Sequence, residues 1–233
     1  MEYIFIICIC VITMVILKFA WNIKIKDIKK LKELGFDKQL NEITNKLPEN
    51  KEICKSILKI LDNENVKIEE SESNQASLYM VLSNSIIIAN IKNTFTRVQT
   101  IAHECLHSIQ NKRTLLFNFI FSNIYFVYFI AICILAILKI NPLPNTALFA
   151  LAICSFINYT IRSYLEMDAM TKAKPLAEQY IKKEGTLTEK EQETILNNYE
   201  EVNNIGIKLY NYSLIVKNLI KIIIYSTICI IFI

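Results

Sequence analysis

Glycine and proline are scarce in this chain, with three and four copies among 233 residues. Hydrophobic residues make up 53%, above the roughly 45–50% of a typical soluble domain. The surplus is concentrated in four long apolar runs with the charges crowded between them: 3–20, 114–138, 144–161 and 212–233. These features exclude a disordered chain, a collagen and an ordinary soluble enzyme.

No CxxC pair occurs, and the seven cysteines form an odd set. Five of them lie inside the apolar runs, where a free thiol behaves as a small hydrophobe: Cys8, Cys10, Cys133, Cys154 and Cys229. Cys54 and Cys105 lie in polar sequence. This distribution excludes a disulfide framework and is typical of a reducing compartment.

Each apolar run predicts a membrane-spanning helix. The 114–138 run has 25 residues without a charge, more than the roughly 20 that cross a bilayer. Two prolines within 141–145 predict a turn between the second and third helices. The first run lacks the positive start of a signal peptide and is followed by lysines, so we expect an uncleaved span. The predicted spans are 1–20, 114–138, 144–162 and 212–233.

Lysine and arginine predict the orientation of these spans. Residues 22–60 carry ten lysines against six acids, whereas the 139–145 loop carries Lys139 alone. By the positive-inside rule, the polar segments 21–113 and 163–211 lie in the cytoplasm and both termini lie outside. Because the net charge of +4 comes from lysines beside apolar runs, we expect a lipid bilayer as partner and no nucleic acid.

The two polar segments show patterns of secondary structure. Hydrophobic spacing predicts three helices in the first segment: 26–46, 50–62 and 94–112. The β-branched run 77–91 predicts a hairpin, with a short strand near 65–69. Thr188 and Glu191 form the capping box of an acidic helix that ends near Asn204. We therefore expect an α-helical integral membrane protein whose α-rich cytoplasmic domain contains a small β-hairpin.

The chain has only two histidines, His103 and His107, which lie four residues apart with Glu104 between them. On a helix, residues i and i+4 project from one face, so both imidazoles can bind one metal ion. Glu104 is rotated by about 100° from His103, which lets it reach a metal-bound water. The spacing predicts a zinc (Zn²⁺) site with Glu104 as general base. The alternative is a polar helix face without a metal.

Catalytic zinc usually takes three protein ligands, and without a third histidine the third must be a carboxylate. Glu166 and Asp168 follow the third span closely, and His107 precedes the second, so the hairpin of spans makes them neighbours. Glu166 has the reach to bind the metal, with Asp168 orienting a histidine N–H from outside. Two alternatives are an ion pair between Glu166 and Arg162, and a ligand from the acidic helix near Glu200, where a solvated face is expected.

The segments AHECLHSIQ and EMDA resemble the motifs of the YugP-like neutral membrane zinc metallopeptidases of bacteria, which read approximately AHExGHxxQ and ExDA. The resemblance implies a gluzincin-type metalloendopeptidase of the bacterial plasma membrane that cleaves peptide or membrane-protein substrates. It implies zinc ligands and a general base at these positions: His103, His107, Glu166 and Glu104. The chain departs from the motif at Leu106, where the family commonly has glycine.

Two other classes of function compete with a peptidase. The first is a non-hydrolytic zinc-binding membrane protein that acts as an assembly factor or sensor. Glu104 argues against it, because a structural site needs no general base and usually closes with a fourth protein ligand. The second is a transporter, which is not expected because no span carries a series of buried acids and bases.

Overall fold

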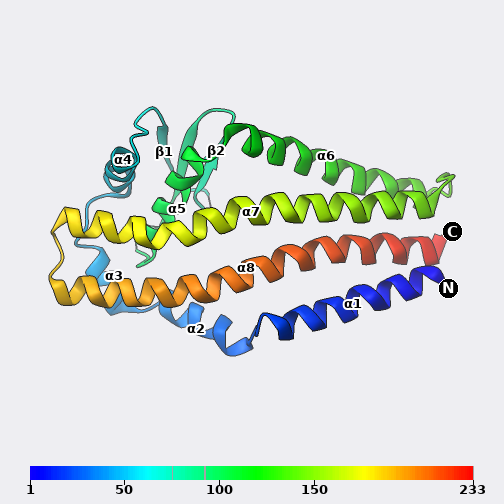
Figure 1. Cartoon of the computed structure of the whole chain (residues 1–233), viewed down its shortest axis with the longest axis horizontal. Helices are drawn as coiled ribbons and strands as arrows, with labels where there is room; N and C mark the ends of the chain where they lie inside the picture. The colour runs from blue at the N-terminus through cyan, green and yellow to red at the C-terminus, as the bar shows by residue number, and fades with distance from the viewer. Residues whose placement is uncertain (75, 92, 233) are drawn as a thin grey trace. The chain divides into compact units, whose positions relative to one another are not determined.

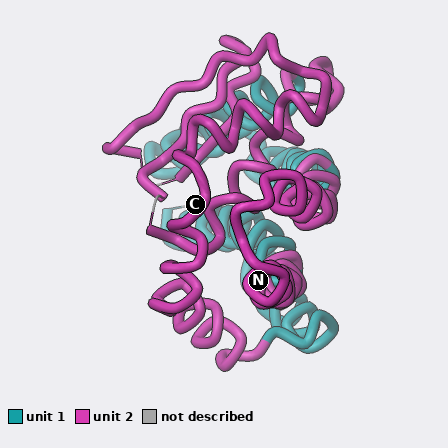
Figure 2. The backbone as a smooth tube through the Cα atoms, turned by 90° about the vertical axis from the view of Figure 1, so that its left-hand side faces the viewer, with its two compact units in different colours: residues 1–23, 117–164, 208–233 teal, residues 24–116, 165–207 magenta. Residues whose placement is uncertain are grey.

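The computed structural model describes residues 1–74, 76–91 and 93–232 and divides into two compact units. Figure 2 colours unit 1, which comprises 1–23, 117–164 and 208–233, and unit 2, which comprises 24–116 and 165–207. In the described residues, eight helices and one three-stranded sheet make up the regular structure. This composition confirms the predicted helical class with a small β element.

Unit 1 is built from the apolar parts of four long helices (Figure 1). They are α1 (Glu2–Ala20), α6 (Lys112–Ile137), α7 (Pro144–Glu184) and α8 (Glu189–Phe232). Each is long and apolar enough to cross a membrane, as the four apolar runs predicted. Large apolar side chains point outward from them, with Phe5 and Phe19 67% and 77% exposed. Such a surface suits contact with hydrocarbon rather than with water.

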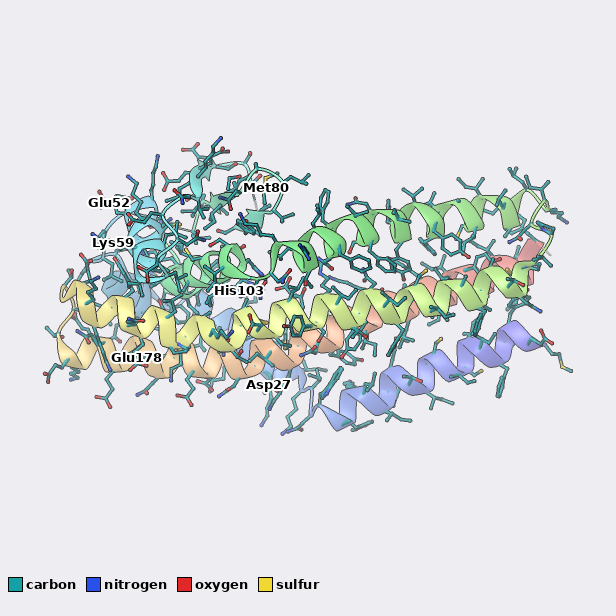
Figure 3. The ribbon with its side chains drawn as sticks, turned by 45° about the horizontal axis from the view of Figure 1, so that its top comes forward. Asp27, Glu52, Lys59, Met80, His103 and Glu178 are labelled. Carbon is teal, nitrogen blue, oxygen red and sulfur yellow. The ribbon has the colours of Figure 1, made fainter. Side chains whose placement is uncertain are left out.

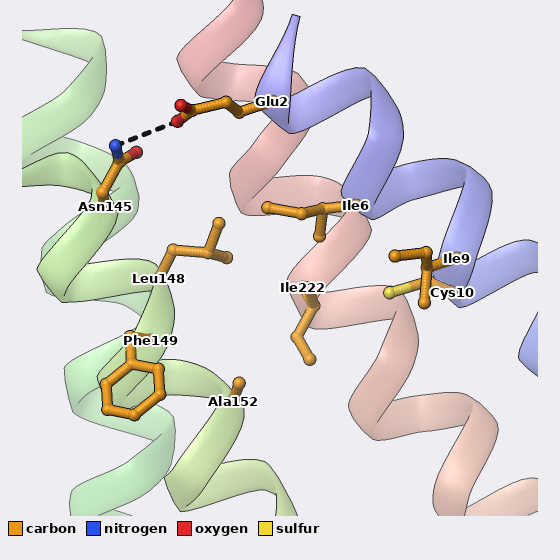
Figure 4. A pocket seen from close by; sticks show the side chains of 9 residues that line it. All are labelled: Glu2, Ile6, Ile9, Cys10, Asn145, Leu148, Phe149, Ala152 and Ile222. Carbon is orange, nitrogen blue, oxygen red and sulfur yellow. Dashed lines mark hydrogen bonds between the residues drawn. The ribbon is translucent and has the colours of Figure 1, made fainter.

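Helix α1 packs loosely within unit 1. Cys10 is its one buried residue among those described. A cavity of about 420 Å³ lies beside it, as Figure 4 shows, and its apolar lining comes from α1, α7 and α8: Ile6, Ile9, Cys10, Leu148, Phe149, Ala152 and Ile222. At one end of this cavity Asn145 Nδ2 donates a hydrogen bond to the Glu2 carboxylate at 3.2 Å.

The last two helices are longer than the sequence predicted. Helix α7 continues past the predicted span 144–162 and through Pro175 to Glu184. The chain leaves α7 through Gly185, whose φ of +69° is a conformation that glycine adopts without strain. The acidic helix and the last apolar run, expected as separate helices, form the single helix α8.

The sheet of unit 2 has the strand order β1-β3-β2. Strands β2 (Leu78–Met80) and β3 (Ser85–Ala89) pair antiparallel, which confirms the predicted hairpin. Strand β1 (Lys67–Ser71) pairs parallel with β3. The central strand β3 is the most buried of the three. Strand β2 lies at one edge of the sheet, because the strand order places β3 on one side of it and no described strand on the other.

Four shorter helices complete unit 2: α2 (Ile25–Gly35), α3 (Lys38–Thr44), α4 (Asn50–Ile60) and α5 (Arg97–Ile109). The single helix expected over 26–46 is wrong, because the chain breaks after Gly35 and Asp37 caps a new helix. The Asp37 carboxylate accepts the Leu40 N–H at 3.0 Å. The core of this unit surrounds α5 and includes fully buried side chains such as Ile101, Ala102 and Cys105.

Candidate metal centre

Helix α5 is anchored at its first residue. The guanidinium of Arg97, 1% exposed, donates four hydrogen bonds of 2.7–2.9 Å to acceptors in and around α3 and α4: Pro48 O, Asn50 Oδ1, Thr44 O and Leu47 O. Burial lowers the pKa of Arg97, and nearby Tyr199 and Tyr180 act against this shift. Because three of these bonds go to main-chain oxygens and one to the Asn50 side chain, they set the position of the helix that follows.

His103 and His107 lie one turn apart on α5 and face Glu166 on α7. Figure 3 labels His103 on α5, beside α7. The two Nε2 atoms are 3.1 Å apart, and Glu166 Oε2 lies 3.3 Å from that of His103 and 3.7 Å from that of His107. The structure therefore brings together the three residues that the sequence analysis expected as metal ligands.

The spacing of these three atoms fits a small divalent cation. Ligand atoms about 2.0–2.2 Å from a tetrahedral zinc ion lie about 3.3–3.6 Å from one another. The three distances between the His103, His107 and Glu166 ligand atoms, 3.1, 3.3 and 3.7 Å, span this range. Two imidazole nitrogens and one carboxylate oxygen are also a ligand set that zinc accepts. The group could hold a metal ion.

Gln110, just after α5, sets the tautomer of His107. Its Nε2 donates to Leu165 O at 2.7 Å and to Asp168 Oδ2 at 3.0 Å. Its Oε1 therefore accepts the proton of His107 Nδ1, 2.8 Å away. With Nδ1 protonated, the neutral imidazole has its lone pair on Nε2, as a metal ligand must, and only a protonated Nε2 donates to Glu166 instead.

The electrostatics of the group favour a cation. Burial would raise the pKa of Glu166, but hydrogen bonds from His103 and His107 outweigh it and hold that pKa well below its usual range. Burial would lower the pKa of His107, but its hydrogen bonds to Glu166 and Gln110 more than offset this and raise it. A positive charge at this position, from a proton or a metal ion, is thus stabilised by the surrounding acceptors.

Glu104 lies beside the group and is 7% exposed. Its Oε2 accepts the backbone N–H of Tyr79 in β2 at 2.7 Å. Burial raises the pKa of Glu104, while the charges of His103 and His107 and the Tyr79 N–H act in the opposite direction. A carboxylate with a raised pKa, fixed by a strand on one side, is suited to accepting and returning a proton.

Asp168 lies two hydrogen bonds away from His107. Its carboxylate bonds to Gln110 and forms an ion pair with Lys172, so it reaches His107 through the Gln110 amide rather than directly. Hydrogen bonds from Lys172 and Gln110 lower its pKa. The sequence analysis gave no role to Gln110. The signal that could have found it is its place three residues after His107 on the same polar helix face.

The structure also bears on three further expectations, which concern the acidic segment near Glu200, the thiol of Cys105 and the carboxylate of Glu166. The acidic part of α8 forms exposed ion pairs, including Lys174 with Glu200 at 2.8 Å, as a solvated face does. Cys105 is fully buried, and its Sγ lies 3.6 Å from that of Cys54, so it belongs to the core and not to the metal group. The carboxylate of Glu166 faces His103 and His107, so the alternative of a simple ion pair with Arg162 does not account for its position.

Comparisons with protein-family models, with curated proteins and with solved structures gave no match to this chain. The resemblance to membrane zinc metallopeptidases therefore rests on the motif residues and on the His103, His107 and Glu166 group that the fold brings together.

Proposed function

We propose that this protein is a membrane zinc metalloendopeptidase whose metal is held by His103, His107 and Glu166. The supporting observation is that three ligand atoms, from helices distant in sequence, converge at zinc-like spacing with Glu104 adjacent to the first histidine. When bound, zinc supplies Lewis acidity that polarises a scissile carbonyl and lowers the pKa of a water toward about 7.

Glu104 carries the proton in this proposal. Its carboxylate accepts a proton from the attacking water and later returns it to the leaving amine. The burial that raises its pKa brings the protonated form closer to neutral pH, which suits a group that must do both. The Tyr79 N–H keeps one carboxylate oxygen in place, so the other is available for the proton.

The edge strand β2 supplies a surface for an extended peptide. Strand β2 pairs with β3 on one side and with no other described strand, so its other edge can still meet an extended segment, although the Tyr79 N–H on that edge is bonded to Glu104. The Tyr79 N–H points to Glu104 from this strand, so the edge lies against the base. A substrate that pairs with β2 by strand addition would pass Glu104, with Leu78 and Met80 exposed beside it.

The proposal also places the protein in the membrane. The helices of unit 1 cross the bilayer as four spans, with the segments 21–113 and 163–211 and the active site on the cytoplasmic side of the plasma membrane. The apolar surface of these helices and the excess of lysine in 22–60 support this arrangement. Peptides or membrane proteins are then the accessible substrates.

Metal content and proteolysis of purified protein test the proposal together. We expect about one zinc per chain, retained in Glu104→Gln and lost in His103→Ala and His107→Ala. Hydrolysis of a peptide library, read by mass spectrometry, should fall by at least about 100-fold in Glu104→Gln because the general base is lost.

Full proteolysis by Glu104→Gln would disprove this mechanism. Zinc binding without hydrolysis by the unmodified chain would favour the alternative, a non-hydrolytic zinc-binding membrane protein that acts as an assembly factor or sensor.

A further inference from the structure

A cluster of polar side chains lies inside the apolar unit 1. The hydroxyl of Tyr125 on α6, a residue only 2% exposed, lies 2.7 Å from Ser155 Oγ on α7 and 3.2 Å from Asn218 Oδ1 on α8. The ammonium of Lys221, one turn after Asn218, lies over the Tyr125 ring at 3.8 Å from its centroid. A cation therefore sits against an aromatic face among three apolar helices.

Lys221 is far from both ends of its apolar segment. The apolar run of α8 begins at Tyr212, and the described helix ends at Phe232. At 1.5 Å per residue, the backbone of Lys221 lies about 14 Å from the first of these residues and about 17 Å from the second. In a hydrocarbon core about 30 Å thick, it lies near mid-depth.

No acid of unit 1 can neutralise this charge. The segments of unit 1 contain a single acidic residue, Glu2, whose carboxylate is bonded to Asn145 at the start of α7. Asn145 precedes Ser155 by ten helical residues, or about 15 Å. Within the described residues, Lys221 has no carboxylate partner, and an aromatic ring offsets only part of the cost of an ion in hydrocarbon.

We propose that Lys221 receives the carboxylate of an acidic residue within a membrane-spanning helix of another protein. The missing counter-charge supports this, since an intramembrane cation is stabilised chiefly by an acid at the same depth. Lys221 is half-buried, and the exposed Ile220 and Ile224 beside it form an apolar face on which a helix can pack. The inference rests on the proposed membrane insertion and not on the metal chemistry.

Two properties distinguish a helix of another protein from a second copy of this chain and from a lipid: whether it carries an acidic residue, and the depth at which its negative charge lies in the bilayer. A second copy of this chain offers no acid near mid-depth, because Glu2 is the only one in its unit 1. The phosphate of a lipid and the carboxylate of a fatty acid remain at the bilayer surface, about 15 Å from its centre. A side chain on a spanning helix can present its carboxylate at the depth of Lys221.

Energy transfer in vesicles tests the proposal. The full chain, labelled with a donor fluorophore, is reconstituted in phosphatidylcholine vesicles, and insertion is verified by resistance to carbonate extraction. The probes are two acceptor-labelled synthetic helices of about 20 leucines and alanines that carry one central Glu or one central Gln. We expect the Glu helix to associate about ten-fold more tightly than the Gln helix.

Matched variants assign the effect to one residue. The preference for Glu should disappear in Lys221→Met, persist in Lys221→Arg, and be unchanged in Lys217→Met, which removes an exposed lysine one turn earlier. Equal binding of the two helices by the unmodified chain would overturn the proposal, and this comparison needs no variant. Displacement of the Glu helix by oleate at equal concentration would overturn it in favour of a fatty-acid site. Failure of insertion would instead refute the membrane assignment itself.

Discussion

At the scale of single residues, Gln110 connects the two helices that carry the candidate metal ligands His103, His107 and Glu166. It accepts the His107 Nδ1 proton and donates to Leu165 O and Asp168 Oδ2, which flank Glu166 in α7. One amide therefore fixes the ring of one expected ligand and the backbone next to another. A ligand held this way loses little freedom when a metal binds, which favours affinity.

We expect Gln110→Ala to weaken zinc binding by about 10–100-fold, because the Nδ1 proton of His107 loses its acceptor and the ring can turn. Competition with a chromogenic chelator measures the affinity. Gln99→Ala is the matched control, since Gln99 lies one turn before His103 on the same helix but bonds to Asn203. Equal affinities for both variants would show that Gln110 does not position the ligand.

Glu166 and Asp168 differ in what they contact, and their isosteric amides should differ in effect. Glu166→Gln removes the charge that faces both histidines, so zinc binding and activity should be almost abolished. Asp168→Asn keeps a group that can accept from Gln110, so the protein should bind zinc about 10-fold more weakly. Bound zinc per chain gives the comparison, and the reverse order would mean that Glu166 is not the third ligand.

The sequence predicted the three candidate metal ligands more completely than the contacts that the residues around them make. His103 and His107 are linked by helical spacing alone, and Glu166 followed from the hairpin of apolar runs. The contact of Glu104 with the Tyr79 N–H depends on a strand 25 residues earlier, whose position against α5 has no local signal. The roles of Gln110 and Asp168 depend on how α5 ends, which helical periodicity does not determine.

At the scale of elements, the start of α8 shows a local signal that the structure confirms. The Thr188 N–H and hydroxyl donate to the Glu191 carboxylate at 3.0 and 2.9 Å, and the Glu191 N–H donates to Thr188 Oγ1 at 3.4 Å. This reciprocal pattern is a capping box, which satisfies N–H groups left free at a helix start. Hydrogen bonds from Lys46 and from Thr188 lower the pKa of Glu191 to about 2, so its carboxylate is charged at neutral pH.

We expect Thr188→Ala to reduce the free energy of unfolding by about 1 kcal/mol, the usual effect of losing an N-cap hydroxyl. Denaturant unfolding in detergent, followed by helix content, measures the change. Thr194→Ala is the control, because Thr194 bonds to a carbonyl within the same helix and caps nothing. A larger loss in the control than in Thr188→Ala would contradict this role for the capping box.

The length of α8 shows where prediction by segments fails. The acidic helix and the last apolar run are expected as separate helices, yet a change of polarity does not by itself end a helix, and α8 runs through both. A real stop needs a backbone signal, and Gly185 with its positive φ provides one after α7. In 26–46 the opposite error arose, because Gly35 and Asp37 end one helix and start another within a continuous hydrophobic pattern.

At the scale of the whole molecule, hydrophobicity and charge separate along the chain into two kinds of structure. Unit 1 contains the long apolar helices, and unit 2 contains the sheet, the metal group and most of the acids. The chain passes between the two units several times, so both polar segments must share one side if four spans form. Their content of lysine favours the cytoplasm.

We therefore predict that positions 45 and 190 are cytoplasmic and position 140 is external. In a chain with exposed Cys8 replaced by serine, Asn45→Cys and Lys190→Cys should resist a membrane-impermeant maleimide on whole cells and react after lysis. Ile140→Cys, in the 138–143 turn, should react in intact cells. All three positions are exposed, so their reactivities depend on the side of the membrane rather than on burial. Labelling of position 45 or 190 from outside would reverse the topology and would move the metal group out of the cytoplasm.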